Sequence, residues 1–163
     1  MPKRKAALLA ERSLSLPADR DRFTDLVDAV ESFGVMCDRR DPEGWLAFVT
    51  AVSEVGGNIL VHAYQGGNPG SVELTLRCFR DRVEASFRDW GAAFEEPPGA
   101  GLAGNADDLD DLDAILGLDE SGRGLALARA ALTSLDYERT APGENHWRLM
   151  KQLPTSTKLT GSA

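Results

Sequence analysis

Residues 53–64 read SEVGGNILVHAY, and this stretch combines a helical apolar pattern with two polar residues four positions apart. Those residues are Glu54 and Asn58, and side chains at that spacing lie on one face of a helix. A neutral amide oxygen beside a carboxylate suits Mg²⁺, which takes few protein ligands and completes its shell with phosphate oxygens and water. Glu54 by itself is more simply explained as a structural acid that bonds a neighbouring arginine or backbone amide.

Two glycines, Gly56 and Gly57, interrupt the same stretch. In a helix interior each costs on the order of 1 kcal/mol relative to alanine, which predicts a close approach by a ligand or by a neighbouring element. The alternative is a locally distorted helix, in which Glu54 and Asn58 no longer share a face.

Outward from this helix, the sequence predicts an α+β domain. Asp41-Pro42-Glu43 is a helix start with Asp as the N-cap, and residues 65–70 (QGGNPG) end that helix in a turn. The other predicted elements are a strand at 13–17, a helix from Asp19 to about Gly34, a hairpin of 71–79 and 82–87, a helix at 125–132, and strands at 135–140 and 147–153. This order predicts a two-layer α/β sandwich, with helices on one face of a mixed, mostly antiparallel sheet.

One folded domain is expected over residues 13–153, with a flexible basic arm at 1–12 and a flexible tail at 154–163. Between about 95 and 121, Pro97-Pro98-Gly99 and several later glycines predict a long excursion that holds a helix at 105–118. Long loops of this kind are often lids over a site.

Composition limits the classes of function. The 163 residues suit one domain, and 18 Lys and Arg against 26 Asp and Glu give a net charge of -8. This acidic balance argues against direct binding of nucleic acid through the phosphate backbone, which needs a basic face. No run approaches the roughly 20 apolar residues of a membrane-spanning helix, so a cytoplasmic protein with no membrane contact is expected. Cys37 and Cys78 are expected to be reduced, buried thiols.

Asp89-Trp90-Gly91 follows the second strand of the predicted hairpin. In isolation these three residues indicate only a turn. A functional interpretation is that the Asp89 carboxylate accepts a hydrogen bond from an exocyclic amine, such as that of adenine. Gly91, which lacks a Cβ, would then let the flat base approach.

Gly122-Arg123-Gly124 precedes a predicted helix. Free backbone N–H groups and the positive end of the helix dipole favour an anion at such a position, so the segment is a candidate phosphate site. Arg123 adds charge near the phosphates under this hypothesis, although a solvated surface arginine is equally common. The sequence contains neither a Walker-type phosphate loop nor a nucleophile elbow with Ser-His-Asp order.

Taken in order, these blocks resemble the motifs of the histidine-kinase-like ATPase superfamily and, within it, of the bacterial anti-sigma-factor serine kinases. Glu54-x-x-x-Asn58 with His62-Ala63-Tyr64 looks like the N box, Asp89-x-Gly91-x-x-Phe94 like the first glycine box, and residues 120–125 (ESGRGL) like the second. Residues 143–149 (GENHWRL) are similar to the final hairpin. The resemblance covers roughly residues 13–151.

The resemblance implies a role for each motif residue. Glu54 is the implied general base toward a protein serine hydroxyl, and Asn58 is the implied Mg²⁺ ligand. Asp89 and Gly91 are implied at the adenine of ATP, and Gly122-Arg123-Gly124 at its phosphates. Members of the family hold a sigma factor inactive, commonly as homodimers. They phosphorylate the STAS-type antagonist whose binding releases that sigma factor.

The expected function is therefore that of an ATP-dependent serine protein kinase that acts as an anti-sigma factor and uses ATP and Mg²⁺. An ATP-binding switch that captures protein partners without transferring phosphate is the alternative. A detached catalytic module of a histidine kinase is a third possibility, but the sequence shows no evident phosphoacceptor or dimerisation helix.

Overall fold

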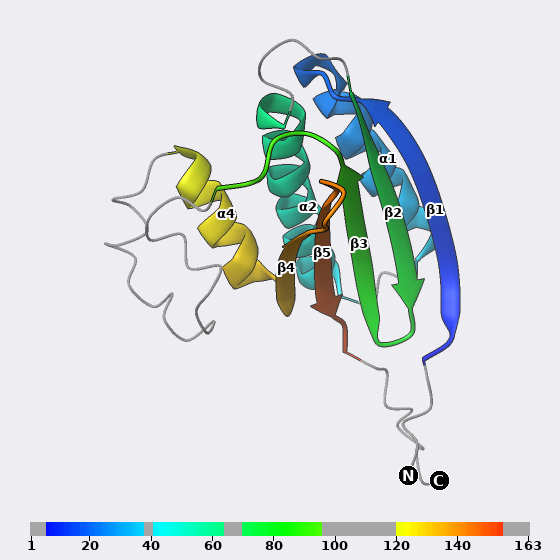
Figure 1. Cartoon of the computed structure of the whole chain (residues 1–163). Coiled ribbons are helices and arrows are strands. Elements are labelled where there is room, and N and C mark those ends of the chain that lie inside the picture. Colours follow the sequence, from blue (N-terminus) through cyan, green and yellow to red (C-terminus); the bar gives the residue numbers. More distant parts are fainter. Residues whose placement is uncertain (1–5, 38–40, 64–69, 96–119, 155–163) are drawn as a thin grey trace, which may run out of the picture.

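The computed structural model describes residues 6–37, 41–63, 70–95 and 120–154, which form two layers (Figure 1). The strands are β1 (Leu8–Pro17), β2 (Ser71–Phe79), β3 (Arg82–Asp89), β4 (Ser134–Arg139) and β5 (Asn145–Gln152). The helices are the short 3-10 turn η1 (Arg20–Arg22), α1 (Phe23–Met36), α2 (Pro42–His62) and α4 (Glu120–Ala131). The expected lid helix at 105–118 lies outside the described residues.

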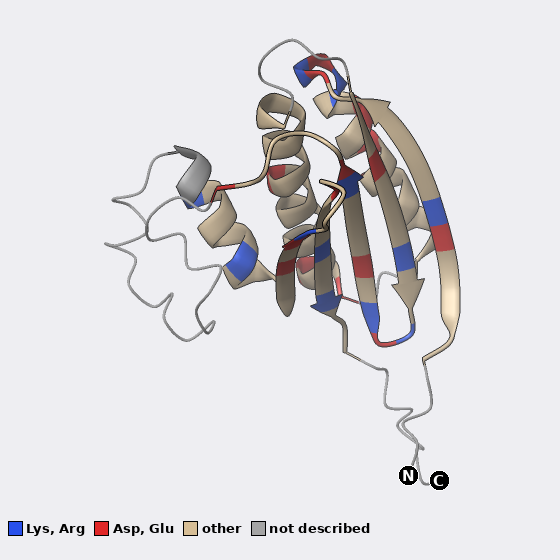
Figure 2. Cartoon of the chain, in the orientation of Figure 1, with Lys and Arg blue, Asp and Glu red and all other residues tan. Residues whose placement is uncertain are grey.

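The described strands form one five-stranded sheet in the order β1-β2-β3-β5-β4. Every pairing in it is antiparallel, so the sheet is not mixed, and in all other respects the predicted α+β sandwich is confirmed. In Figure 1, α1 and α2 lie side by side behind the sheet, and α4 packs against α2. The opposite face of the sheet is open and carries many charged residues, as Figure 2 shows.

The alternation of side chains along each strand decides which residues reach the helical layer. In β2 and β3 every second residue is buried, up to Asp89 at the end of β3. Strand β5 follows the same pattern with Asn145, Trp147 and Leu149. Apolar residues fill most of these positions, but Asp89 and Asn145 are polar and lie opposite each other in the β3–β5 register. The fold therefore buries two polar side chains together at one end of the sheet.

Helix α2 is the central helix of the core. Asp41 caps it as predicted, because its side chain accepts a hydrogen bond from the backbone N–H of Gly44 at 2.9 Å. By length and composition alone α2 could cross a membrane, which differs from the expectation from the sequence. In the fold, however, 56% of its most apolar window is buried, as in the core helix of many globular domains.

The paired glycines of α2 allow close packing, and the helix stays regular through both of them. A Cβ on Gly56 would overlap Leu26 of α1 and lie 3.0 Å from the ring of Phe87 in β3. A Cβ on Gly57 would lie 3.1 Å from the ring of Phe23 at the start of α1. Of the two sequence-based explanations, the close approach of neighbouring elements therefore holds, and the distorted helix does not.

Alanine substitutions should separate these two glycines. Gly56→Ala is expected to lower the free energy of unfolding by about 1–3 kcal/mol, because the added methyl group must displace Leu26 in a filled core. Gly57→Ala is the matched control, since Phe23 is 42% exposed and can give way. Loss of a helix glycine should there leave stability unchanged or raise it by up to about 1 kcal/mol. Urea unfolding measures both values, and equal destabilisation would contradict the packing argument.

Strand β1 is longer than predicted. It begins at Leu8, so residues 8–12, expected in the flexible arm, belong to the sheet. The physical reason is that Ala10 is buried under the helices and Glu11 forms an ion pair with Arg77 of β2. The other predicted elements outside the lid are all found among the described residues, with ends shifted by a few positions.

Candidate functional site

Glu54 lies on α2, the helix against which α4 packs. Its side chain is exposed, yet a Cβ built on Gly124 would overlap its carboxylate, so Glu54 touches α4 at that glycine. Gly124 is the fifth residue of α4, which begins at Glu120. The fold thus brings the predicted base to the first turns of the helix that carries the predicted phosphate segment.

The predicted phosphate segment lies inside α4 rather than before it. Gly122 and Arg123 fall among the first four residues of the helix, and Gly124 follows them. The first four N–H groups of a helix have no partner within it, and the dipole makes this end positive. The backbone of Gly122 and Arg123 can therefore face an anion, whereas Gly124 gives room to Glu54. The Arg123 side chain is exposed, so both interpretations of it stay open.

Asn58 follows Glu54 by one turn of α2. Its Nδ2 is buried, and no hydrogen-bond partner for this atom is found among the described residues. An unpartnered buried amide costs about 1–3 kcal/mol, so its position favours a partner from outside the described residues, such as a bound ligand. Because the two ends of an amide exchange by rotation, the group can present its oxygen to a cation.

A nucleotide-bound Mg²⁺ fits this position. Within the described ranges, no group of three or more His, Cys, Asp or Glu side chains converges to hold a metal ion. A cation beside Asn58 would therefore take most of its ligands from phosphate oxygens and water, which is the usual arrangement for Mg²⁺.

Asp89 ends β3 with 1% of its surface exposed. Its Oδ1 accepts hydrogen bonds from Asn145 Nδ2 at 2.8 Å and from the Gly91 N–H at 2.9 Å. Burial raises the pKa of Asp89 above its ordinary value, while these two hydrogen bonds and the charge of Arg139 act to lower it. No hydrogen bond to its Oδ2 is found among the described residues, so this oxygen can accept one from a ligand amine such as that of adenine.

The fold itself requires a glycine at position 91, apart from the hypothesis that a base approaches there. A Cβ there would overlap the carbonyl of Ala63, the residue that follows α2, and the N–H of Ala92 donates to the same carbonyl at 2.6 Å. This contact joins the C-terminal end of α2 to the end of β3. It therefore brings Asp89 to the end of the helix that carries Asn58.

Sequence reasoning misses three residues of this site. Asn145 donates to Asp89, and Tyr137 and Arg139 of β4 both donate to Asn145 Oδ1 at 2.7 Å. The one available signal is the alternation of the last strand, which puts polar Asn145 at a position equivalent to that of buried Trp147. That signal indicates a buried polar group but does not name its partner.

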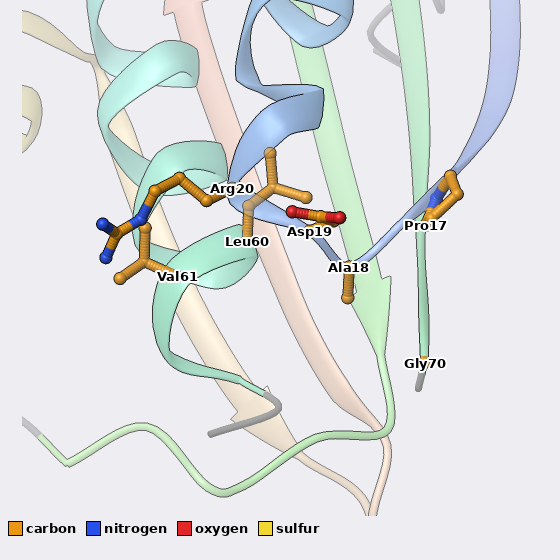
Figure 3. A pocket seen from close by; sticks show the side chains of 7 residues that line it. All are labelled: Pro17, Ala18, Asp19, Arg20, Leu60, Val61 and Gly70. Carbon is orange, nitrogen blue, oxygen red and sulfur yellow. The ribbon is translucent and has the colours of Figure 1, made fainter. Parts of the chain in front are cut away.

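The hollows found among the described residues lie elsewhere. One, of about 360 Å³, lies between the end of β1, η1 and the last turn of α2. Figure 3 shows the side chains that line it. A second, of about 490 Å³, adjoins it beside the start of α1, and a third, of about 360 Å³, lies on the open face of the sheet. None of the three is lined by the candidate residues. Residues 64–69, which come after α2, and residues 96–119, which come after the Asp89–Gly91 segment, are outside the described residues. The candidate site is therefore defined by contacts between residues and not by a cavity.

Comparisons with known proteins concern the family and the fold of the chain. The sequence profile of the histidine kinase-like ATPase domain matches residues 16–151. The serine/threonine-protein kinase BtrW of Bordetella bronchiseptica is 36% identical over 96 residues, a match that covers 59% of this chain and 62% of that protein. The chain thus spans less than two thirds of the length of this relative.

Solved structures give the same fold. A chain in the crystal structure of the SiaB-SiaC complex from Pseudomonas aeruginosa superposes with a TM-score of 0.52, over 90% of this chain and 91% of that chain. The two sequences are 14% identical, so the likeness concerns the arrangement of helices and strands alone.

Proposed function

The chain belongs to the histidine kinase-like ATPase family, and we propose that it is an ATP-dependent serine protein kinase of the anti-sigma type. The observation that carries this proposal is the contact of the Glu54 carboxylate with Gly124 in the first turns of α4. A base therefore lies beside the backbone that would hold the phosphates, and it is exposed, so that the hydroxyl of another protein can reach it. The name of the Bordetella relative supports the same class of reaction.

The proposed residues divide the recognition of ATP between its two ends. Asp89 accepts a hydrogen bond from the adenine amine, and the backbone of Gly91 lies beside the base. The N–H groups of Gly122 and Arg123 face the phosphates at the positive end of α4, and Gly124 beside them gives room to Glu54. Asn58 would hold Mg²⁺ through its amide oxygen, and when bound this ion would neutralise the charge that develops on the phosphates.

Glu54 acts on the incoming hydroxyl group of the substrate protein. As the serine oxygen bonds to the γ-phosphorus, the bond from that phosphorus to the bridging oxygen of ADP breaks, and the serine proton passes to the Glu54 carboxylate. Phosphoryl transfer of this kind depends mainly on positioning and charge stabilisation. The close packing of α2 on α1 and β3 at Gly56 supports that positioning.

The proposed partners are a sigma factor, which the protein holds inactive as a homodimer, and a STAS-type antagonist, which it phosphorylates. This places its work in transcription regulation in the cytoplasm, without direct contact to nucleic acid or membrane. The support is the motif resemblance and the kinase name of the relative. The net charge of -8 is also suited to association with basic protein surfaces.

Mg-ADP is expected to raise the melting temperature, because a ligand that binds only the folded state stabilises it by mass action. At 100 times the dissociation constant the gain is about 2.7 kcal/mol. For a domain of this size that gain corresponds to roughly 5–10 °C. Thermal unfolding with Mg-ADP, and with Mg-GDP as control, measures the effect. Mg-GDP should give the smaller shift, since guanine bears a carbonyl at the position where adenine bears the amine that would donate to Asp89. No shift with Mg-ADP would contradict the proposal.

Transfer itself is tested with the purified protein, labelled ATP and a STAS-domain antagonist. Phosphoserine on the antagonist is the expected product. Nucleotide-dependent capture of the antagonist without label would support the ATP-binding switch instead. Label on a histidine of the protein itself would support the detached histidine-kinase module.

A further inference from the structure

Asn145 uses both ends of its side-chain amide. The residue is 2% exposed, and its Oδ1 accepts hydrogen bonds from the Tyr137 hydroxyl and from Arg139 Nη1, both at 2.7 Å. Its Nδ2 donates to Asp89 Oδ1 at 2.8 Å and to the carbonyl of Ala92 at 3.0 Å. Rotation of the amide by 180° would set its oxygen against two acceptors and its NH2 group against two donors. One orientation is therefore strongly favoured.

Neighbouring groups also fix the orientation of the Tyr137 hydroxyl. It accepts a hydrogen bond from the Phe94 backbone N–H at 3.0 Å, so its own proton is directed to Asn145. Its ring packs against Phe94 and Trp147, with ring centroids 5.5 and 4.7 Å away. These contacts hold the donor to Asn145 in place.

Asp89 receives its protein hydrogen bonds on one oxygen. Asn145 and the Gly91 N–H both donate to Oδ1, and no hydrogen bond to Oδ2 is found in the part of the chain that the structure describes. Oδ2 is therefore the atom left for a ligand. An ionised carboxylate accepts hydrogen bonds and cannot donate them, so it distinguishes a base that bears an amine from one that bears a carbonyl at the same position.

We propose that Asn145 is a positioning residue that sets base specificity, because it holds Oδ1 of Asp89 and so directs Oδ2 to the 6-position of a purine. The inference rests on the proposed nucleotide site and adds to it a residue to which the motif resemblance gives no role. Arg139 is the charged group that acts on Asp89 among the described residues, and it favours the ionised form, as Asn145 does.

The effect on ionisation gives the proposal a distinct signature. Burial raises the pKa of Asp89, and the hydrogen bond from Asn145 opposes this rise. Removal of the Asn145 amide therefore raises the pKa of Asp89 further. In the variant, Asp89 should stay neutral over a wider range of pH. A neutral carboxyl can donate a hydrogen bond to the carbonyl of a base, so it no longer prefers a base that bears an amine.

The test compares Asn145→Ala with the parent protein in calorimetric titrations with Mg-ADP and with Mg-IDP, whose base bears a carbonyl in place of the amine. The parent protein is expected to prefer ADP. In the variant, affinity for ADP should fall about tenfold while affinity for IDP stays nearly unchanged. The loss of ADP binding on acidification should also move to higher pH.

Ser86→Ala is the matched control. It removes the side-chain hydrogen bond between Ser86 and His146, 2.9 Å long, which joins the same two strands on their opposite face. This variant is expected to change neither the preference for ADP nor the pH profile. Equal losses for ADP and IDP in Asn145→Ala, with an unchanged pH profile, would show structural support alone and overturn the inference.

A second variant covers the case in which Asn145→Ala does not fold. Tyr137→Phe combined with Arg139→Met removes both donors to Asn145 Oδ1 and frees the amide to rotate, and it should reduce the preference for ADP in the same direction. A parent protein that binds Mg-ADP with a preference that neither variant alters would refute the inference alone. A parent protein that binds neither nucleotide would refute the proposed function and the inference with it.

Discussion

Replacing Glu54 by glutamine is expected to slow phosphoryl transfer by about 10²-fold or more while leaving nucleotide affinity nearly unchanged. The glutamine side chain has almost the same size, so the contact with Gly124 can persist. An amide, however, cannot take the proton of the serine hydroxyl. Single-turnover transfer of label to a STAS-domain antagonist measures the chemical step, and a thermal shift with Mg-ADP measures binding separately.

Glu43→Gln is the matched control for this variant. Glu43 is exposed in the first turn of α2, several turns before Glu54. The substitution makes the same change of charge. Its turnover should equal that of the parent protein. Unchanged turnover in Glu54→Gln would contradict the assignment of Glu54 as the general base. Equal losses in both variants would indicate a general effect of charge on α2.

The elements around Glu54 can be predicted from sequence because local chemistry determines them. Asp41 caps α2 through a hydrogen bond within one turn, and the apolar spacing that follows needs no distant partner. The alternation of β2 and β3 likewise follows from burial on one face of the sheet. The cost of Gly56 in a helix predicts a close neighbour, and the structure supplies Leu26.

The parts that sequence does not predict depend on contacts between distant residues. The glycines of the phosphate segment suggest a loop before α4, but the helix begins at Glu120 and includes them. Gly91 suggests room for a base, whereas in the structure a glycine is needed there because the carbonyl of Ala63 lies against it. Asn145 lies in the block that resembles the final hairpin, but it has no role until the sheet register sets it opposite Asp89. In each case the partner lies on another element, and local patterns carry no information about it.

Asp89→Asn is expected to weaken the binding of Mg-ATP by about 10²-fold and to affect Mg-GTP much less. The two hydrogen bonds that the described residues donate to the Asp89 side chain both reach Oδ1, so an amide oxygen in that place can keep them. The NH2 group then takes the place of Oδ2 and opposes the adenine amine with a second donor. Calorimetric titration with both nucleotides measures the selectivity. Equal binding of ATP and GTP by the parent protein would discredit the adenine role.

The same substitution should act on stability in the opposite direction, which separates a binding role of Asp89 from a packing role. Because burial raises its pKa above the ordinary 3.8, the folded state holds this proton more tightly than the unfolded chain does. The stability that the neutral carboxyl contributes is complete below that value and is lost as pH rises through the higher pKa of the folded state. At neutral pH Asp89→Asn should therefore unfold at a higher urea concentration than the parent protein, and this advantage should vanish in acid. Asp136→Asn, exposed on β4, is the control and should show no such gain. A less stable Asp89→Asn variant at neutral pH would mean that the carboxylate serves the fold. A residue kept for its ligand instead leaves the empty protein with a buried charge that its hydrogen bonds and Arg139 compensate only in part.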